Sequence, residues 1–171
     1  MNDRQKAILA EIPRLRRYAR SLMRDSDRAD DLVQDCLERA FTRMANWQTG
    51  ENPRRWLFTI MHNIFIDVVR KDQRRGDTVP LSDMEGGQSS VAAVQHDKLV
   101  ALDVLDALQE IDPDRRAALM LVAVEGFSYA EAAGILDVPA GTLMSRIARG
   151  RAELRSVLED DARARAIKVV E

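Results

Sequence analysis

The chain has 171 residues, of which 46% are hydrophobic, 32% are charged and 5% are aromatic, and its formal net charge is −2. The apolar content is enough for a core, and β-branched and aromatic clusters are sparse, so the composition favours an all-α fold over a large sheet. Because the sequence has neither a secretory signal nor an apolar run of the roughly 18 residues that span a membrane, we expect a cytoplasmic protein with no membrane insertion.

The cysteine and the histidines suggest no metal or redox chemistry. Cys36 is the single cysteine, so an internal disulfide is excluded, and His62 and His96 lack the spacing of metal ligands. We therefore expect neither a metal nor a cofactor.

Charge is unevenly distributed along the chain. Residues 1–75 carry 16 Lys/Arg against 11 Asp/Glu, whereas residues 76–127 carry 3 against 10 and residues 128–171 carry 7 against 7. A basic front and an acidic middle indicate separate electrostatic tasks, which the small net charge of the whole chain conceals.

Residues 1–75 are predicted to form one helical unit. A first helical stretch spans about Asp3 to Met23 and is kinked or broken at Pro13. A second helix begins with Ser26 or Asp27 as its cap.

The second helix has two contrasting faces. Its apolar stripe at helical spacing predicts a core face: Ala29, Leu32, Val33, Cys36, Leu37, Ala40, Phe41 and Met44. Its outward face carries Asp31, Gln34, Asp35 and Glu38. From the residues alone, this outward face is a solvated surface.

A third helix begins with Asn52 as N-cap and Pro53 at its first position. Its core positions are Leu57, Ile60, Met61, Ile64, Phe65 and Val68, and it ends in the basic cluster Arg70, Lys71, Arg74 and Arg75. Arg54 and Arg55 oppose the helix dipole at its start, which suggests a use elsewhere, such as a phosphate backbone. The alternative is that both arginines are solvated and screened.

Aromatic and amide side chains flank the start of this third helix. Trp47 and Trp56, beside Asn52 and Asn63, could supply a stacking surface and hydrogen bonds for an unpaired base. For Trp56 alone, core packing is the alternative.

A change of composition divides the chain. Residues 76–96 contain Gly-Gly, Ser-Ser, a proline and three acids with no base, which predicts a flexible acidic linker. Residues 97–158 form a second helical unit, and residues 159–171 are a polar tail that frays.

The second unit is punctuated by helix signals. Asp112 can cap a helix with Pro113 at its first position, and Gly126 ends it. Ser128 and Glu131 form a capping box for a short helix to Leu136.

A longer basic helix then starts at Pro139, with Leu143, Ile147 and Leu154 on its inner face and Ala140 and Gly150 nearby. A short helix, a tight turn and a longer basic helix are the helix-turn-helix arrangement, with the second helix reading DNA.

The reading helix carries the predicted base and phosphate contacts. We expect it to expose Thr142, Met144, Ser145, Arg146, Ala148 and Arg149 to the major groove, and Arg151 and Arg155 to phosphates. A basic helix end that complements the dipole would explain Arg155 but not Arg146.

Three segments in order, "DRADDLVQDCLERAF", "RRWLFTIMHNIFIDVVRK" and "GFSYAEAAGILDVPAGTLMSRIARGRAEL", resemble bacterial sigma factors of the extracytoplasmic-function (ECF) group. The resemblance covers roughly residues 5–75 and 97–158 and implies sigma regions 2 and 4 joined by a flexible linker. "IPRLRRYARSL" and "DRADDLVQ" are similar to the branch that runs the general stress response in alphaproteobacteria.

The resemblance implies tasks for region 2. The face formed by Asp31, Gln34, Asp35 and Glu38 would dock onto the clamp helices of the polymerase β′ subunit. The 47–75 segment would open and read the −10 element, with a base flipped into a pocket. Its expected DNA-binding residues are Trp47, Asn52, Arg54, Arg55, Asn63, Arg70 and Lys71.

For region 4, the resemblance implies that the 139–151 helix reads the −35 element and that the unit touches the β flap. Its expected DNA-binding residues are Thr142, Met144, Ser145, Arg146, Arg149 and Arg151. The acidic linker resembles the family segment that threads the RNA exit channel. Met144 and Ala148 stand where relatives often have larger or basic residues, so Ser145, Arg146 and Arg149 would carry more of the readout.

Three functions are therefore compared. The first is a transcription initiation factor that is not an enzyme, binds RNA polymerase core and promoter DNA, and is held closed by an anti-sigma factor. The second is a helix-turn-helix regulator that works without polymerase, which leaves the acidic face and linker unexplained. The third is a sigma mimic that sequesters an anti-sigma partner; Arg146, Arg149 and the basic 70–75 cluster argue against it.

Overall fold

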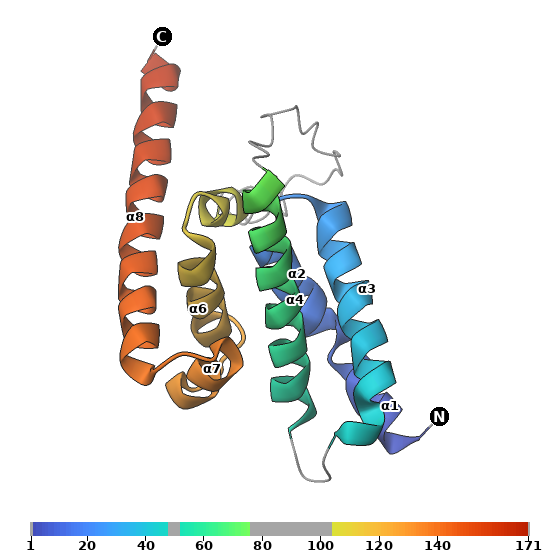
Figure 1. Cartoon of the computed structure of the whole chain (residues 1–171). Helices are drawn as coiled ribbons and strands as arrows, with labels where there is room; N and C mark the ends of the chain where they lie inside the picture. Colours follow the sequence, from blue (N-terminus) through green and yellow to red (C-terminus); the bar gives the residue numbers. More distant parts are fainter. Residues whose placement is uncertain (1, 48–51, 76–103, 171) are drawn as a thin grey trace.

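The computed structural model describes residues 2–47, 52–75 and 104–170, and within these ranges every regular element is a helix (Figure 1). The elements are α1 (Asp3–Ala10), α2 (Ile12–Leu22), α3 (Ser26–Arg43), the 3-10 turn η1 (Met44–Asn46), α4 (Pro53–Arg75), α6 (Pro113–Ala123), α7 (Tyr129–Leu136) and α8 (Ala140–Val170). Residues 104–109 are also helical. The all-α prediction is confirmed, while the predicted linker at 76–96 lies outside the described residues.

The first unit packs α1 to α4 around a shared core. The break predicted near Pro13 is confirmed, because Glu11 ends α1 and precedes α2. The cap of α3 is Asp25, whose side chain accepts from the amides of Asp27 and Arg28. Our prediction of Ser26 or Asp27 was therefore wrong by one or two residues. The Asp25 carboxylate lies within reach of amides in the first turn of α3, which have no hydrogen-bond partner within the helix.

The core stripe of α3 is confirmed in its centre and wrong at one end. Ala29, Leu32, Val33, Cys36 and Ala40 are buried. Phe41, in contrast, is 39% exposed, and Leu37 and Met44 are only partly buried against the core. Of the eight predicted positions, Phe41 is therefore the one that faces solvent.

Helix α4 starts as predicted, since the Asn52 side chain accepts from the Arg54 amide at 3.0 Å. The predicted core positions are buried except Val68, which is partly buried. Phe58 and His62 are buried as well, although we did not predict it. Both side chains face the second unit, and the apolar periodicity of one helix does not predict a contact with a distant part of the chain.

The second unit contains the predicted helix-turn-helix. Asp112 caps α6 and the Ser128–Glu131 capping box opens α7, both as predicted. Gly126 lies just beyond α6 with φ +70°, a backbone conformation that favours glycine. Asp137 takes the left-handed conformation that turns the chain from α7 towards α8.

Helix α8 differs from the prediction at both ends. Leu143 and Ile147 are buried and Leu154 is partly buried, but Ala140 is exposed and does not belong to the inner face. The helix continues past Glu159 to Val170, where we predicted a fraying tail.

The two predicted units are packed against each other. Helix α4 lies between α3 on one side and α6 and α7 on the other (Figure 1), and α2 contacts α6. The rings of Phe58 in α4 and Phe127 before α7 meet edge to face at 5.1 Å. One continuous cluster of buried side chains therefore joins the units, and the chain is closed upon itself.

Candidate nucleic-acid interface

The exposed side of α8 presents most of the predicted reading residues. Thr142, Ser145, Arg149 and Arg151 are exposed, and Met144 is 53% exposed. These side chains emerge from a helix whose opposite side is fixed by Leu143 and Ile147 in the core. The core therefore holds the first turns of α8 in place, and a major groove is wide enough to admit such a helix.

Arg146 is not freely exposed, contrary to our prediction. It is half-buried, and its Nη2 atom lies 2.8 Å from Oδ2 of Asp114 in α6. The cause is proximity, because the capped first turn of α6 places a carboxylate beside α8. Arg146 and Arg149 line a shallow hollow there with Thr142, Ser145, Asp112 and Asp114.

Arg54 is partly buried and engaged by the second unit, contrary to our alternative that it is solvated, while its predicted contact with a phosphate backbone stays a prediction. Its guanidinium donates to the backbone oxygen of Glu125, lies 3.5 Å from the Glu125 carboxylate and stands 4.4 Å from the centre of the Phe127 ring. Its neighbour Arg55 is exposed but extends across Gly134 of α7, where an added Cβ would collide with the guanidinium. The second unit thus covers Arg54 and lies against Arg55, while Asn52 at the start of α4 stays exposed.

Trp47 and Trp56 stack on each other rather than offering their facing surfaces to a base. Their ring centres are 5.7 Å apart and their planes differ by 9°. Trp47 is 8% exposed and Trp56 packs partly against the core. The Arg4 guanidinium lies 5.8 Å from the Trp47 ring centre. Core packing, our alternative for Trp56, also describes Trp47.

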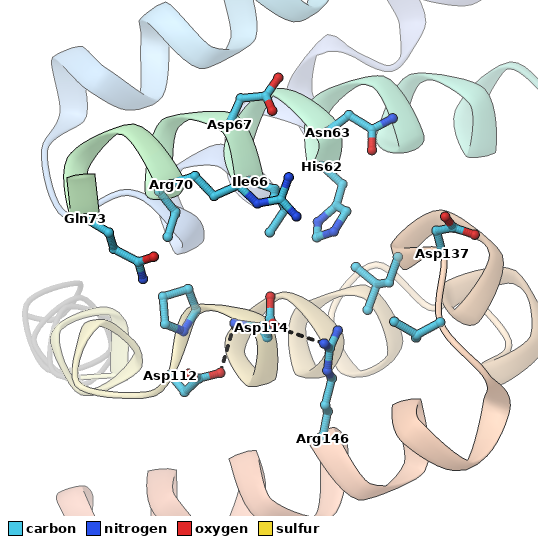
Figure 2. Close-up of a pocket in the computed structure, with 14 residues that line it drawn as sticks. His62, Asn63, Ile66, Asp67, Arg70, Gln73, Asp112, Asp114, Asp137 and Arg146 are labelled. Atoms are coloured by element: carbon cyan, nitrogen blue, oxygen red, sulfur yellow. Dashed lines mark hydrogen bonds and ion pairs between the residues drawn. The ribbon is translucent and has the colours of Figure 1, made fainter. Parts of the chain in front are cut away.

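A polar hollow of about 580 Å³ lies at the edge of the interface between α4 and the second unit (Figure 2). Asn63 and Arg70 line it from α4, and Asp114 and Arg146 line it from the opposite side. Two predicted −10 residues therefore lie across from a predicted −35 residue. The exposed Lys71 lies beyond this lining.

His62 also lines this hollow and was not among our candidates. It is 4% exposed, and burial lowers its pKa to about 4, against a smaller opposing effect of Asp114. Nδ1 finds no hydrogen-bond partner among the described residues. The imidazole is therefore neutral at physiological pH and sits beside both units.

The acidic face of α3 is exposed, as predicted. Asp31, Gln34, Asp35 and Glu38 all reach solvent, and the Gln34 amide donates to the Glu38 carboxylate at 3.1 Å. Helix α3 itself lies on the side of α4 away from α6 and α7 (Figure 1). It remains open while the units are closed.

Within the described residues there is no cluster of His, Cys, Asp or Glu that could hold a metal. Cys36 is buried, and that burial raises the pKa of its thiol to about 12. No described helix combines the length and the apolarity needed to cross a bilayer.

Comparison with known proteins decides the family. Residues 8–62 match the Sigma2 domain of PhyR, and residues 101–154 match Sigma-70, region 4. The chain is 39% identical over 157 residues to the ECF RNA polymerase sigma factor EcfG of Rhodopseudomonas palustris (strain TIE-1), covering 90% of this chain and 84% of that protein. The chain belongs to the ECF sigma factors.

Other relatives agree with this sigma factor assignment. The ECF sigma factor SigE of Mycolicibacterium smegmatis is 36% identical over 156 residues, covering 85% of this chain and 57% of SigE. Among solved structures, the sigma factor RpoE in complex with the anti-sigma factor NepR from Bartonella quintana matches with a TM-score of 0.76 and 33% identity, covering 93% of this chain and 98% of that one.

Two further residues of this sigma factor were not predicted from the sequence. The Glu125 side chain is fully buried, and Arg17 of α2 holds it with two bonds, Nε–Oε1 at 2.9 Å and Nη2–Oε2 at 3.0 Å. These hydrogen bonds raise the pKa of Arg17. An acid within the apolar run "LMLVAVEGF" was the available signal, because a buried carboxylate needs a charged partner.

Proposed function

We propose that this sigma factor directs core RNA polymerase to a class of promoters and helps to open the duplex, without bond chemistry of its own. One observation carries the proposal: a single chain of this family exposes both a helix-turn-helix reading surface and, on a separate helix, an acidic docking face. A helix-turn-helix regulator that works alone would need only the first of these surfaces.

The −35 contacts are assigned to α8. The exposed Arg149 guanidinium matches the paired O6 and N7 acceptors of guanine, and Thr142 and Ser145 can reach bases or phosphates. Arg151, further along the helix, suits a phosphate. Met144 offers an apolar contact such as a thymine methyl group, and Arg146 joins the readout once it leaves Asp114.

The −10 contacts are assigned to α4 and the segment before it. Asn52, Asn63, Arg70 and Lys71 are exposed and can act without rearrangement. Arg54 and Arg55 must first leave the second unit, and Trp47 must leave Trp56 if it is to stack on a base. Promoter opening is thus coupled to separation of the units.

Core polymerase is assigned to the exposed face of Asp31, Gln34, Asp35 and Glu38 on α3, with a clamp-helix surface of positive charge as the complementary partner. Region 4 is assigned a second contact with the β flap. Docking at two distant points would hold the units at the separation of the −35 and −10 elements.

The regulatory partner is proposed to be an anti-sigma factor. The RpoE match is a complex with NepR, and CnrH, which matches at 25% identity and a TM-score of 0.65, is in complex with the cytosolic domain of CnrY. By the EcfG and RpoE–NepR likenesses we assign this chain to the stress-response branch. A cytoplasmic location follows from a task performed on RNA polymerase.

The test is transcription in vitro from a pool of genomic templates with purified core enzyme. We expect starts downstream of a shared −35/−10 pair that appear only when the chain is added. Failure to initiate at any such promoter would refute the proposal.

A sigma mimic is the second candidate, because residues 8–62 match a domain named for PhyR, and PhyR of Bartonella quintana is an anti-anti-sigma factor. A mimic has no need of base contacts. Arg149→Ala should therefore lower promoter output in the sigma factor but leave the binding of an anti-sigma partner intact. Unchanged output with retained partner binding would favour mimicry.

A further inference from the structure

We propose that Glu125 is an autoinhibitory latch: its buried carboxylate holds region 4 against region 2 and occupies Arg54, so that the reading surface at the start of α4 cannot form until the latch opens. The proposal rests on the proposed promoter function, because the inhibition concerns the −10 contacts assigned to α4. The closed contact itself is a property of the chain and can be tested without DNA.

The carboxylate is held from both sides by region 2. Arg17 of α2 binds both oxygens at 2.9 and 3.0 Å, and Arg54 of α4 approaches Oε2 at 3.5 Å. The Glu125 side chain is fully buried, whereas Arg17 is half exposed. Burying a carboxylate without a cationic partner costs free energy, so the closed state needs the bonds from Arg17 and Arg54.

The position of Arg54 makes closure and DNA binding exclusive. Its side chain is 21% exposed and is enclosed by Glu125, by the Phe127 ring and by Glu11 of the first unit, 3.9 Å away. A phosphate or a base can reach this guanidinium only after Glu125 and Phe127 have moved. Glu125 therefore takes the place of the negatively charged DNA backbone.

A second set of bonds closes the other end of the interface. Arg116 of α6 is 5% exposed and donates to the Leu22 backbone oxygen at 2.8 Å, and the Gln109 amide donates to the Ser21 backbone oxygen at 3.0 Å. Side chains of region 4 thus cap carbonyls at the end of α2 that have no partner within their own helix. Closure satisfies polar groups of both units at once.

The exposed pair between Arg24 and Glu110 offers a matched control. It crosses the same interface at 2.6 Å, but both side chains are more than half exposed. Exposed ion pairs contribute little to stability, so Glu110→Gln should hardly change the closed population. Glu125→Gln removes one charge from the same interface, at a buried place.

The experiment measures the separation of the units in the free, full-length protein. Fluorescent labels are placed at Arg39→Cys on α3 and Ser156→Cys on α8, both exposed, and Cys36 is too deeply buried to compete. We expect one short-distance population without substitution. Glu125→Gln should lower the closed-to-open ratio about tenfold, and Glu110→Gln less than about twofold.

Arg17→Ala is a second test of the latch, in case the substitution of the buried Glu125 prevents folding. It removes the bidentate contact from a half-exposed position outside the assigned DNA and polymerase surfaces, and it should open the protein in the same direction. Changing both Arg17 and Glu125 should then add less than the sum of the single effects. Unchanged distances in both single variants would overturn the latch.

Transcription provides the inhibitory readout. At limiting concentrations of the chain with core enzyme, Glu125→Gln should raise the transcript yield several-fold above the unsubstituted protein, and at saturation the two should agree. If the units open and the limiting yield stays the same, Glu125 is a contact but not an inhibitor, and the proposal fails. If the unsubstituted protein gives no transcript at all while Glu125→Gln still opens the units, it is the promoter function that fails.

Discussion

Arg146 of α8 and Asp114 of α6 form an ion pair with 2.8 Å between Nη2 and Oδ2 at the edge of the polar hollow between the units (Figure 2). An arginine that we assign to the −35 element is thus held by an acid of its own domain. Its guanidinium is already oriented by one carboxylate, and it must exchange that partner for a base or a phosphate when DNA binds.

We expect Asp114→Asn to release Arg146 at a small cost in stability. Both side chains are partly exposed, so the free energy of unfolding should fall by only about 0.5 kcal/mol. Binding of the polymerase complex to promoter DNA should tighten, because no carboxylate then competes for the guanidinium. Urea unfolding and a promoter titration measure the two effects; weaker DNA binding would mean that Asp114 positions Arg146 for the DNA.

Arg149 and Arg151 should respond differently to replacement. Arg149→Ala should cost about 1–3 kcal/mol of promoter binding and relax the preference at one base pair, as expected for a contact to guanine. Arg151→Ala should weaken binding to all promoters alike. It should also reduce the slope of log K against log salt concentration by about one, as expected for the loss of one phosphate contact. Titrations of the polymerase complex on promoters with single changes in the −35 element distinguish the two, and identical behaviour would contradict the assignment.

Charge reversal on α3 tests the polymerase surface. Asp35→Arg should abolish most of the affinity for core polymerase while leaving the helix content unchanged, because the side chain is exposed and makes no core contact. Asp106→Arg, at an exposed position of the second unit, is the control with the same change of charge. Equal affinities of both variants would remove the docking role from this face.

His62 should make stability depend on pH. Its pKa in the folded protein is lowered to about 4 from 6.5, so the unfolded chain binds a proton more readily between these values. The free energy of unfolding should therefore fall as the pH drops from 6.5 towards 4, by at most about 1.4 kcal/mol per pH unit from this group.

His62→Gln provides the comparison for that slope. It retains a polar side chain that cannot titrate, so the loss of stability between pH 6.5 and 4 should be shallower than in the unsubstituted protein. Thermal unfolding at several pH values measures both. Parallel pH profiles would show that other groups govern the acid sensitivity.

The sequence was informative where the determinants are local. The capping box of Ser128 and Glu131, the Asp112 cap and the break before Pro13 each depend on residues a few positions apart, and all three were predicted. The exposed acidic face of α3 followed from the helical period in the same way.

Closure of the two units could not be predicted, because its determinants are distant. Arg17 and Glu125 are 108 residues apart, and Arg54 and Glu125 are 71 apart, so no period relates them. The same contact explains why Arg54 is not solvated, contrary to our alternative for it, and why the burial of Phe58 and His62 was missed. Each of these side chains finds its partner only in the other unit.

The most direct test compares one −35/−10 promoter fragment bound by the chain alone and by the chain on core polymerase. Because closure encloses Arg54 at the start of α4 and polymerase supplies the spacing, we predict weak and unspecific binding by the free chain. We predict tight, specific binding by the complex at the same salt concentration. Tight and specific binding by the chain alone would contradict this account and identify a regulator that needs no polymerase.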